Sequence, residues 1–435
     1  MEYSGWCAAG KSAAVNILGK GLNMENDIIV GLDIGTTKVC AVVASVDEMG
    51  RFNVIGVGRS PSDGLTRGVV THIDKTIRSI QSAVGEAEAR SGIRIQSVIV
   101  GIAGDHIQSF QSRGVIAISG AENEITQSDV NRLIEDTKRV ALPSDRRIIH
   151  VIPQEFIIDG QDGVYNPVGM SGIRLEANVH IITGLVTAAQ NIYKCVQRAG
   201  LQIRDMVLEP LASSYAVLDE EEKEVGIAML DVGGGTTDLA IFEDRTIRYT
   251  SVIGIAGNQV TNDLRKGLGV ITEQAEKIKC LHGFAYLPSV VDDGPITVPG
   301  IGGRPPLEID KRLIAQIIQP RMEEIFEWAA YEIKRSGYSR HLSAGVVLTG
   351  GGALLKGVAE LAREVLGMPV KIGIPSGFNA GLVREVENPM YATCVGLVLH
   401  GLRNKEATPM EFTNGKHKGS IKKVFATMKH WFDDL

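Results

Sequence analysis

The sequence predicts a two-lobed α/β protein with duplicated subdomains, a small inserted α+β subdomain and a C-terminal amphipathic helix. The chain has 435 residues, which is too long for one ordinary hydrophobic core. An apolar strand, an Asp, a Gly/Thr turn and a second apolar strand begin at Gly31, and this pattern recurs, altered, from Met229. The last residues, 420–435, carry large apolar side chains at helical spacing. These three observations give the two lobes and the terminal helix.

The composition indicates a globular protein with reduced thiols. Hydrophobic residues make up 44% of the chain and charged residues 22%. A formal net charge of −6 argues against a nucleic-acid binder. The five cysteines are scattered, which argues against a disulfide framework or a zinc site. We find neither a signal peptide nor an apolar run of membrane-spanning length, so we expect any membrane contact to be peripheral.

The first 26 residues follow no regular period, and we predict that residues 1–26 are a disordered leader. Within them, Gly5–Ser12 satisfies the phosphate-loop pattern GxxxxGK[ST]. That motif needs a buried strand in front of it, and only four residues precede Gly5. A leader that is flexible, or wrongly assigned to the protein, is therefore the better interpretation of this match.

We assign the first lobe to residues 27–104 and 186–222. The β-rich runs Ile28–Leu32 and Val39–Val46 flank a Gly-Thr-Thr turn and predict a hairpin. The other elements expected in this lobe are a helix over Asp74–Arg90 with Asp74 as its cap, a strand over Val98–Gly101, a helix over Thr187–Arg198, a strand over Asp205–Glu209 and a solvated acidic loop over Asp219–Glu224.

Residues 105–185 read as an inserted subdomain with the order β-α-β-β. Its expected elements are an alternating strand over Gly114–Ser119, a helix capped at Thr126 or Ser128, a strand near Ile148–Ile152, a turn-rich passage over Asp159–Ser171 and a strand into Ile182. The chain then returns to the first lobe, and residues 223–402 form the second lobe, with 257–344 as its smaller subdomain.

The repeated hairpins carry the chemistry that we expect of a phosphate site. Glycines allow close approach of the backbone, and consecutive N–H groups bind anions. Asp33 and Asp231 end their strands, where they can hold a hydrated Mg²⁺. The predicted phosphate-binding residues are Gly35, Thr36, Thr37 and Lys38 in the first hairpin and Gly233, Gly234, Gly235, Thr236 and Thr237 in the second. One such hairpin alone is more often only a tight turn, but two in register favour a ligand.

A third glycine-rich segment strengthens this interpretation. Residues 345–358 read as a buried strand, a run of three glycines (350–352) and a helix. Backbone at such a junction can lie flat against an adenine or a ribose, so Gly351 and Gly352 are candidate nucleoside contacts.

In this order, the three segments resemble the phosphate-1, phosphate-2 and adenosine motifs of the actin/DnaK-type chaperone/sugar kinase ATPase superfamily. Leu208-Glu-Pro-Leu-Ala-Ser-Ser is similar to its first connecting segment, which implies that Glu209 positions water. Ala275-Glu-Lys-Ile-Lys is similar to its A-E-x-I-K segment, which implies that Glu276 and Lys279 reach the ribose and base of ATP. The resemblance implies an actin-like fold with ATP and Mg²⁺ between the lobes.

Within this superfamily the chain resembles the FtsA family of bacterial actin-like cell-division proteins from about residue 27 onward. The resemblance rests on Gly31-Leu-Asp-Ile-Gly-Thr-Thr-Lys, Asp231-Val-Gly-Gly-Gly-Thr-Thr-Asp, Gly257-Asn-Gln-Val-Thr-Asn-Asp-Leu, the insert and the tail. It implies a filament-forming protein that anchors the FtsZ ring to the cytoplasmic face of the cell membrane at the division site and recruits other division proteins. At most weak ATPase activity is expected.

The tail predicts a flexible linker over residues 403–419 and an amphipathic helix over 420–435. The apolar side chains of this helix fall on one face, while lysines occupy the others. The predicted membrane-binding residues are Ile421, Val424, Phe425, Met428, Trp431 and Phe432, together with Lys422, Lys423 and Lys429. Docking on the protein's own core and insertion in a partner's groove are the other two readings, and the linker and lysines favour an anionic membrane surface.

Two further functions compete with a division scaffold. A small-molecule kinase of the same superfamily would need a substrate pocket with a catalytic base and would gain nothing from the tail. A pilus-assembly scaffold of the PilM type shares the lobes and the insert. That family does not depend on a terminal amphipathic helix, so the tail argues against it.

Overall fold

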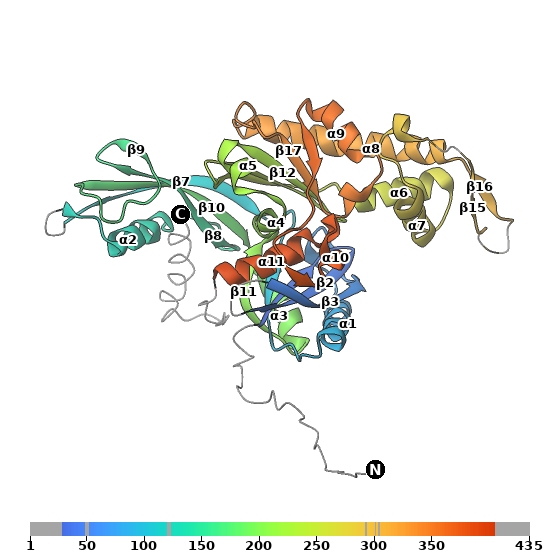
Figure 1. Ribbon diagram of the computed structural model, residues 1–435, viewed down its shortest axis with the longest axis horizontal. Helices are drawn as coiled ribbons and strands as arrows, with labels where there is room; N and C mark the ends of the chain where they lie inside the picture. Colours follow the sequence, from blue (N-terminus) through green and yellow to red (C-terminus); the bar gives the residue numbers. More distant parts are fainter. Residues whose placement is uncertain are drawn as a thin grey trace, which may run out of the picture.

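A computed structural model describes residues 28–47, 52–119, 123–291, 294–300, 302 and 305–404 (Figure 1). The predicted leader with its Gly5–Ser12 match lies outside these residues. The terminal helix and all but the first two residues of the predicted linker also lie outside them. Among the described helices, none has both the length and the apolarity that crossing a bilayer requires.

The first lobe is built on a six-stranded sheet in the order β11-β6-β1-β2-β3-β19. The predicted hairpin is confirmed, because β1 (Ile28–Ile34) pairs antiparallel with β2 (Lys38–Val46). The remaining strands of this sheet are β3 (Phe52–Pro61), β6 (Ser97–Ile102), β11 (Gln202–Leu208) and β19 (Ala380–Gly381). Nearly every side chain of β1 and β2 is buried, as expected for strands covered on both faces.

Helices cover both faces of this sheet. In Figure 1, α1 (Ile73–Ser91) and α3 (Val186–Arg198) lie below the strands and α11 (Ala392–Arg403) lies above them. The predicted cap of α1 is wrong: the helix begins after His72, and Asp74 lies in its first turn, where a carboxylate favours the positive end of the helix dipole. A small hairpin of β4 (Leu65–Thr66) and β5 (Val69–Val70) precedes α1.

The second lobe repeats this arrangement in a five-stranded sheet of order β14-β13-β12-β17-β18. Here β12 and β13 form the hairpin, and β17 lies parallel to β12 as β6 lies parallel to β1. The internal repeat in the sequence is therefore a repeat in structure. The strands are β12 (Ile227–Val232), β13 (Thr237–Glu243), β14 (Thr246–Ile253), β17 (Val346–Thr349) and β18 (Val370–Ile372).

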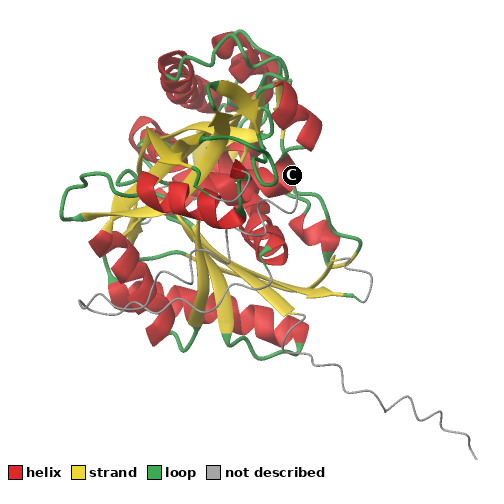
Figure 2. Cartoon of the chain, turned by 90° about the vertical axis from the view of Figure 1, so that its left-hand side faces the viewer, coloured by secondary structure: helices red, strands yellow, loops and turns green. Residues whose placement is uncertain are grey.

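The smaller part of the second lobe extends to the right in Figure 1. It contains α6 (Gly257–Leu268), α7 (Thr272–His282), β15 (Ile296–Val298), β16 (Leu307–Ile309) and α8 (Lys311–Arg335). After β17 come a short 3-10 helix (Gly351–Leu354), α9 (Val358–Leu366), α10 (Val383–Val386) and a second short 3-10 helix (Pro389–Tyr391). Figure 2 shows the strands enclosed between helices.

The insert forms its own four-stranded sheet, in the order β7-β10-β8-β9, with α2 packed on one face. Its elements are β7 (Gln108–Ala117), α2 (Gln127–Thr137), β8 (Arg146–Ile158), β9 (Gln161–Val164) and β10 (Arg174–Leu185). The cap predicted at Thr126 is confirmed by a capping box with Asp129. The predicted order β-α-β-β missed the strand β9. This strand follows a tight turn at Asp159 and Gly160, both of which have positive φ.

Another correction concerns the acidic segment before the second lobe. The predicted loop at Asp219–Glu224 contains the helix α5 (Glu220–Val225). Asp219 and Glu222 form a capping box, and Lys223 is 3% exposed, with its ammonium group over the rings of Tyr215 and Phe242. An acidic run can therefore be helical when its one lysine packs inward.

Two helices join the lobes. The first, α4 (Glu209–Val217), follows β11 and packs against α11. A Cβ atom at Gly396 of α11 would lie 1.8 Å from the carbonyl oxygen of Ala212 in α4, so only glycine permits this approach. Cys394 and Cys40 are buried core residues, as expected. The cleft between the lobes thus has two closely packed helices behind it.

Candidate functional site

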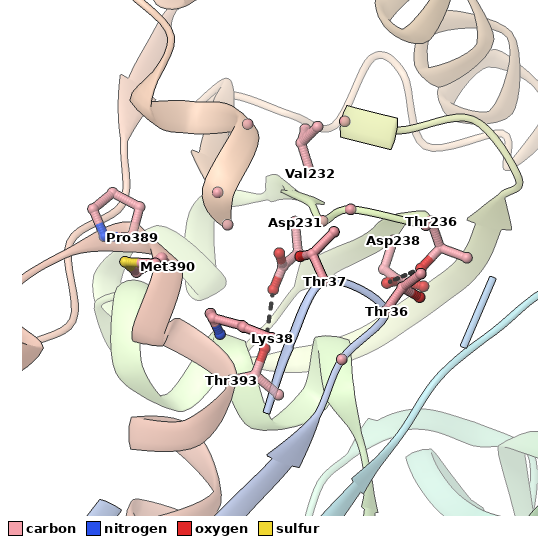
Figure 3. Close-up of a pocket in the computed structure, with 18 of the residues that line it drawn as sticks. Thr36, Thr37, Lys38, Asp231, Val232, Thr236, Asp238, Pro389, Met390 and Thr393 are labelled. Carbon is pink, nitrogen blue, oxygen red and sulfur yellow. Dashed lines mark hydrogen bonds between the residues drawn. The ribbon is translucent and has the colours of Figure 1, made fainter. Parts of the chain in front are cut away.

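The turns of the two repeated hairpins meet at a cavity of about 350 Å³ between the lobes (Figure 3). Both turns close with the same bond: the Gly35 N–H donates to the Lys38 carbonyl, and the Gly233 N–H donates to the Thr236 carbonyl, each at 3.0 Å. A Cβ at Gly234 would lie 2.2 Å from Thr37 Cγ2. A Cβ at Gly235 would likewise lie 2.4 Å from Thr36 Oγ1, so the contact between the two loops requires glycine at both positions.

Four carboxyl side chains gather beside the hairpins: Asp33, Glu209, Asp231 and Asp238. Burial raises the pKa of Asp238 to about 8, and the neighbouring Asp231 adds to this effect. Burial also raises the pKa of Glu209 well above its ordinary range, and the other three carboxylates raise it further. The group thus holds more negative charge than the site can easily carry.

Asp231 is fixed by two hydroxyl groups. Its Oδ2 accepts hydrogen bonds from Ser213 at 2.8 Å and from Thr393, at the start of α11, at 3.3 Å. Figure 3 shows the Thr393 bond, and it shows Thr36 beside Thr236 and Asp238. Burial raises the pKa of Asp231, although these hydroxyl groups oppose the effect. Both connecting helices therefore contact one carboxylate of the site.

A partly buried lysine lies beside these carboxylates. The Lys38 ammonium donates to Asp33 Oδ2 at 3.0 Å. Burial alone would lower the pKa of Lys38, but Asp33 and the nearby thiols of Cys40 and Cys394 raise it above its ordinary value, so the side chain stays charged. Lys38 thus forms an ion pair with one of the four carboxyl groups, that of Asp33.

The remaining negative charge fits a magnesium ion. Asp238 Oδ1 is buried and has no hydrogen-bond partner among the described residues. Within the described part of the chain, no three His, Cys, Asp or Glu side chains converge as a ready metal-binding set. This oxygen-rich set therefore fits a hydrated ion, which keeps several of its own waters, better than a stripped one.

On the opposite side, Glu276 and Lys279 of α7 line the cavity as a pair. The Lys279 ammonium donates to Glu276 at 2.7 Å, to Thr261 at 2.8 Å and to the Gly257 carbonyl at 3.1 Å. Burial works against the ionised form of Glu276, but Lys279 and Thr261 bring its pKa below the ordinary value. Since the three donors of Lys279 are used internally, its contact with a ligand would run through the aliphatic stem.

The third glycine run closes the cavity beside an apolar wall. Gly350 has φ of 81°, and a Cβ on it would lie 2.3 Å from Asp231 Oδ1. Gly351 and Gly352, the candidate nucleoside contacts, line the cavity. The apolar part of the wall comes from Met322, Leu354 and Leu355. A flat, partly apolar ring such as a nucleobase fits this combination.

The structure brings every predicted cleft residue to the cavity except Thr237. The Thr237 side chain is fully buried, and its hydroxyl donates to the Ile255 carbonyl at 2.8 Å. It starts β13, where side chains alternate, so Thr236 and Asp238 face the cavity and Thr237 faces away. The predicted membrane-binding residues, 421–432, lie outside the described part of the chain.

Sequence reasoning missed several lining residues. Asp238 could have been found from strand alternation, because it shares a face with Thr236. No local signal marks Thr393, Met390 or Gly68, which reach the cavity from other segments of the chain, whereas Cys280 directly follows the predicted Lys279 in α7. Thr36 is held in place by one of them, since its hydroxyl accepts the Gly68 N–H at 3.1 Å.

Comparison with family models gives two matches. The model described as "Cell division protein FtsA" matches residues 228–396, and the model described as "SHS2 domain inserted in FTSA" matches residues 104–183. The second match covers the insert.

Comparison with individual proteins agrees. The cell division protein FtsA of Pseudomonas aeruginosa is 45% identical over 93% of this chain and 97% of its own length. That of Escherichia coli K12 is 39% identical over 94% of this chain and 97% of its own.

Two solved structures share the fold at low sequence identity. A PilM-PilN type IV pilus biogenesis complex matches with TM-score 0.64 and 16% identity, covering 86% of this chain and 98% of that one. MreB5 of Spiroplasma citri bound to ADP matches with TM-score 0.53 and 16% identity, covering 88% and 98%. These matches confirm the predicted actin-like fold, to which the insert adds.

Proposed function

The chain belongs to the FtsA family of cell division proteins, and from this premise we propose that it binds ATP with Mg²⁺ in the cavity between its lobes and acts as a membrane-attached scaffold. The observation that carries the nucleotide proposal is the meeting of two matched Gly/Thr hairpins beside four carboxyl groups and the partly buried Lys38. Such a site pairs anion-binding backbone with a place for a divalent cation.

Each wall of the cavity has its own part in this proposal. The phosphates lie between the turns at Gly35–Lys38 and Gly233–Thr236, where backbone N–H groups and the Lys38 ammonium bind them. Asp33 and Asp231 hold Mg²⁺ through its waters, and the ion supplies positive charge to the phosphates. Glu276, the stem of Lys279 and the backbone of 351–352 receive the nucleoside. Thr237 has no direct part.

We propose that the protein has at most weak ATPase activity. Glu209 begins α4 and is the candidate for orienting a water molecule. Burial and the neighbouring carboxylates raise its pKa, which favours the protonated form, and a protonated carboxyl accepts a proton poorly. A Mg²⁺ ion bound nearby would lower this pKa, so a larger fraction of Glu209 would be ionised and able to accept a proton.

We propose that the tail places the protein on the membrane. Residues 421–432 combine an apolar face with Lys422, Lys423 and Lys429, and each lysine near an anionic surface contributes about 1 kcal/mol. By family membership, the bound protein then assembles into filaments, anchors the FtsZ ring at the cytoplasmic face and recruits other division proteins. No nucleic acid is involved.

The alternatives from the sequence are less well supported. The likeness to a PilM complex is at 16% identity and concerns the fold alone. The relatives at 39% and 45% identity are division proteins. A screen of small-molecule acceptors for ATP-dependent phosphorylation tests the kinase alternative, and we expect it to detect no phosphorylated product.

Sedimentation with anionic liposomes tests the scaffold proposal. The full chain is expected to sediment with the vesicles, and a chain ending at Asn404 is expected to stay in solution. Equal sedimentation of the two chains would refute the tail as the anchor. A pull-down with FtsZ, using the truncated chain as well, then tests the division partner separately from the membrane.

A further inference from the structure

The insert contacts both lobes. It is rooted in the first lobe, since β7 follows β6 closely and β10 runs directly into α3. Ile107, Ile152 and Ile182 of the insert belong to the hydrophobic core that the first lobe also uses. In Figure 1 the insert lies to the left, next to both lobes.

Its side chains cross to the edge strand of the second lobe. β14 is an edge strand of the five-stranded sheet: one of its edges pairs with β13, and its other edge faces the insert. The Gln111 amide donates to the Arg248 carbonyl at 3.0 Å, and the buried Gln154 amide donates to the Ile247 carbonyl at 2.7 Å. Gln154 also donates to the Arg248 carbonyl at 3.3 Å, Ser109 Oγ donates to the Thr250 carbonyl at 3.0 Å, and His180 is bonded to the Thr250 hydroxyl at 3.0 Å. The insert thus holds four backbone or side-chain groups of β14.

The same strand leads directly to the cavity. After β14 ends at Ile253, the chain passes Ile255, which accepts the Thr237 hydroxyl, and enters α6. The Gly257 and Asn258 N–H groups then donate to the carbonyls of Gly233 and Gly234, at 3.0 and 2.8 Å. The hairpin of the second lobe and the end of β14 are therefore one hydrogen-bonded unit.

We propose that the insert is a latch that holds β14, and with it the second Gly/Thr hairpin, against the first hairpin. The latch consists of Ser109, Gln111, Gln154 and His180. Opening of the cleft separates the second lobe from the first and breaks these bonds. The latch therefore sets how often the cleft opens and how long a nucleotide stays. The second effect rests on the proposed function.

The test removes the amide donors of Gln111 and Gln154 while it keeps the size of both side chains. The variant Q111M/Q154M replaces both amides by a similarly long apolar side chain, and Q127M is the matched control, because Gln127 bonds only within α2, to Asn131. Loss of two neutral hydrogen bonds predicts an opening equilibrium raised about tenfold. Q111M alone alters an exposed side chain, and provides the same comparison with a smaller change if the double variant fails to fold.

Two measurements on the full chain separate the latch from the nucleotide proposal. Hydrogen–deuterium exchange without nucleotide is expected to rise at residues 231–238 and 253–258 in the latch variants and not in Q127M. Exchange that rises only within the insert, or not at all, overturns the latch. Release of a fluorescent ATP analogue is expected to be about tenfold faster in the double variant, and an unchanged rate also overturns the latch. If the unsubstituted chain binds no analogue, the proposed function fails, while the exchange comparison still decides the latch.

Discussion

Replacing Gly234 by alanine tests the contact between the two hairpins. The new Cβ would lie 2.2 Å from Thr37 Cγ2 and 2.8 Å from Thr37 Oγ1. Carbon atoms in contact are normally at least about 3.5 Å apart, so the loops must separate by about 1.3 Å or more. The added methyl group meets Thr37 of the opposite hairpin, so the substitution acts on the contact between the two hairpins.

The magnitude follows from this overlap. Overpacking of this kind costs about 1–3 kcal/mol of folding free energy. Thr37→Ser removes Cγ2, the atom that clashes most, so the double variant G234A/T37S should recover about 1 kcal/mol or more. Thr36→Ser is the matched control, since the closest approach to Thr36 comes from Gly235.

The assay is a double-mutant cycle measured by denaturant unfolding, without nucleotide and with a chelator. One cycle compares the unsubstituted chain with G234A, T37S and G234A/T37S, and the control cycle uses T36S in place of T37S. We expect a coupling energy of at least about 1 kcal/mol between positions 234 and 37, and one near zero between 234 and 36. G234A should also bind ATP more weakly, because its loops no longer present their N–H groups together. Additive effects of G234A and T37S would refute the contact and the cleft built on it.

Three further predictions concern other parts of the molecule. First, burial lowers the pKa of His180 from 6.5 to about 4, so between these pH values the unfolded chain binds a proton that the folded chain refuses. The free energy of unfolding should therefore fall as the pH drops through this window, by at most about 1.4 kcal/mol per pH unit from this group, and H180N should flatten the slope measured by denaturant titration. Second, Glu209→Gln should lower any ATPase rate at least tenfold while ATP affinity stays within about twofold; an unchanged rate removes Glu209 from the chemistry. Third, Gly396→Ala should lower the free energy of unfolding by about 2 kcal/mol or more, whereas Gly85→Ala, whose Cβ meets nothing within 4 Å, should leave it unchanged or raised.

The hairpins could be predicted because their signals are local. A buried strand, an Asp and a Gly/Thr turn lie within about ten residues, and the alternation of side chains along a strand could even have placed Asp238 on the same side as Thr236. The duplication then gave the relation of the two lobes. Thr237 was misplaced because the motif was taken as a run of ligands, although strand geometry turns alternate side chains away.

The rest of the site depends on contacts between distant segments. Thr393 reaches Asp231 across 162 positions of the sequence, and Thr36 meets the Gly68 N–H across 32. No pattern within one segment encodes such contacts. The latch has the same character, since Gln111 and Gln154 look like ordinary polar side chains of strands until the edge of β14 lies beside them.

The central claim, that ATP occupies the cavity between the hairpins, is tested most directly by the reactivity of Cys280. This thiol is exposed and lines the cavity, whereas Cys40, Cys195 and Cys394 are buried. Cys7 lies outside the described residues, so the experiment uses the variant C7S. Burial and Glu276 raise the pKa of the Cys280 thiol, so maleimide labelling is followed at mildly alkaline pH. We predict that saturating ATP with Mg²⁺ slows labelling at least tenfold. Labelling at the same rate with and without ATP would contradict the account.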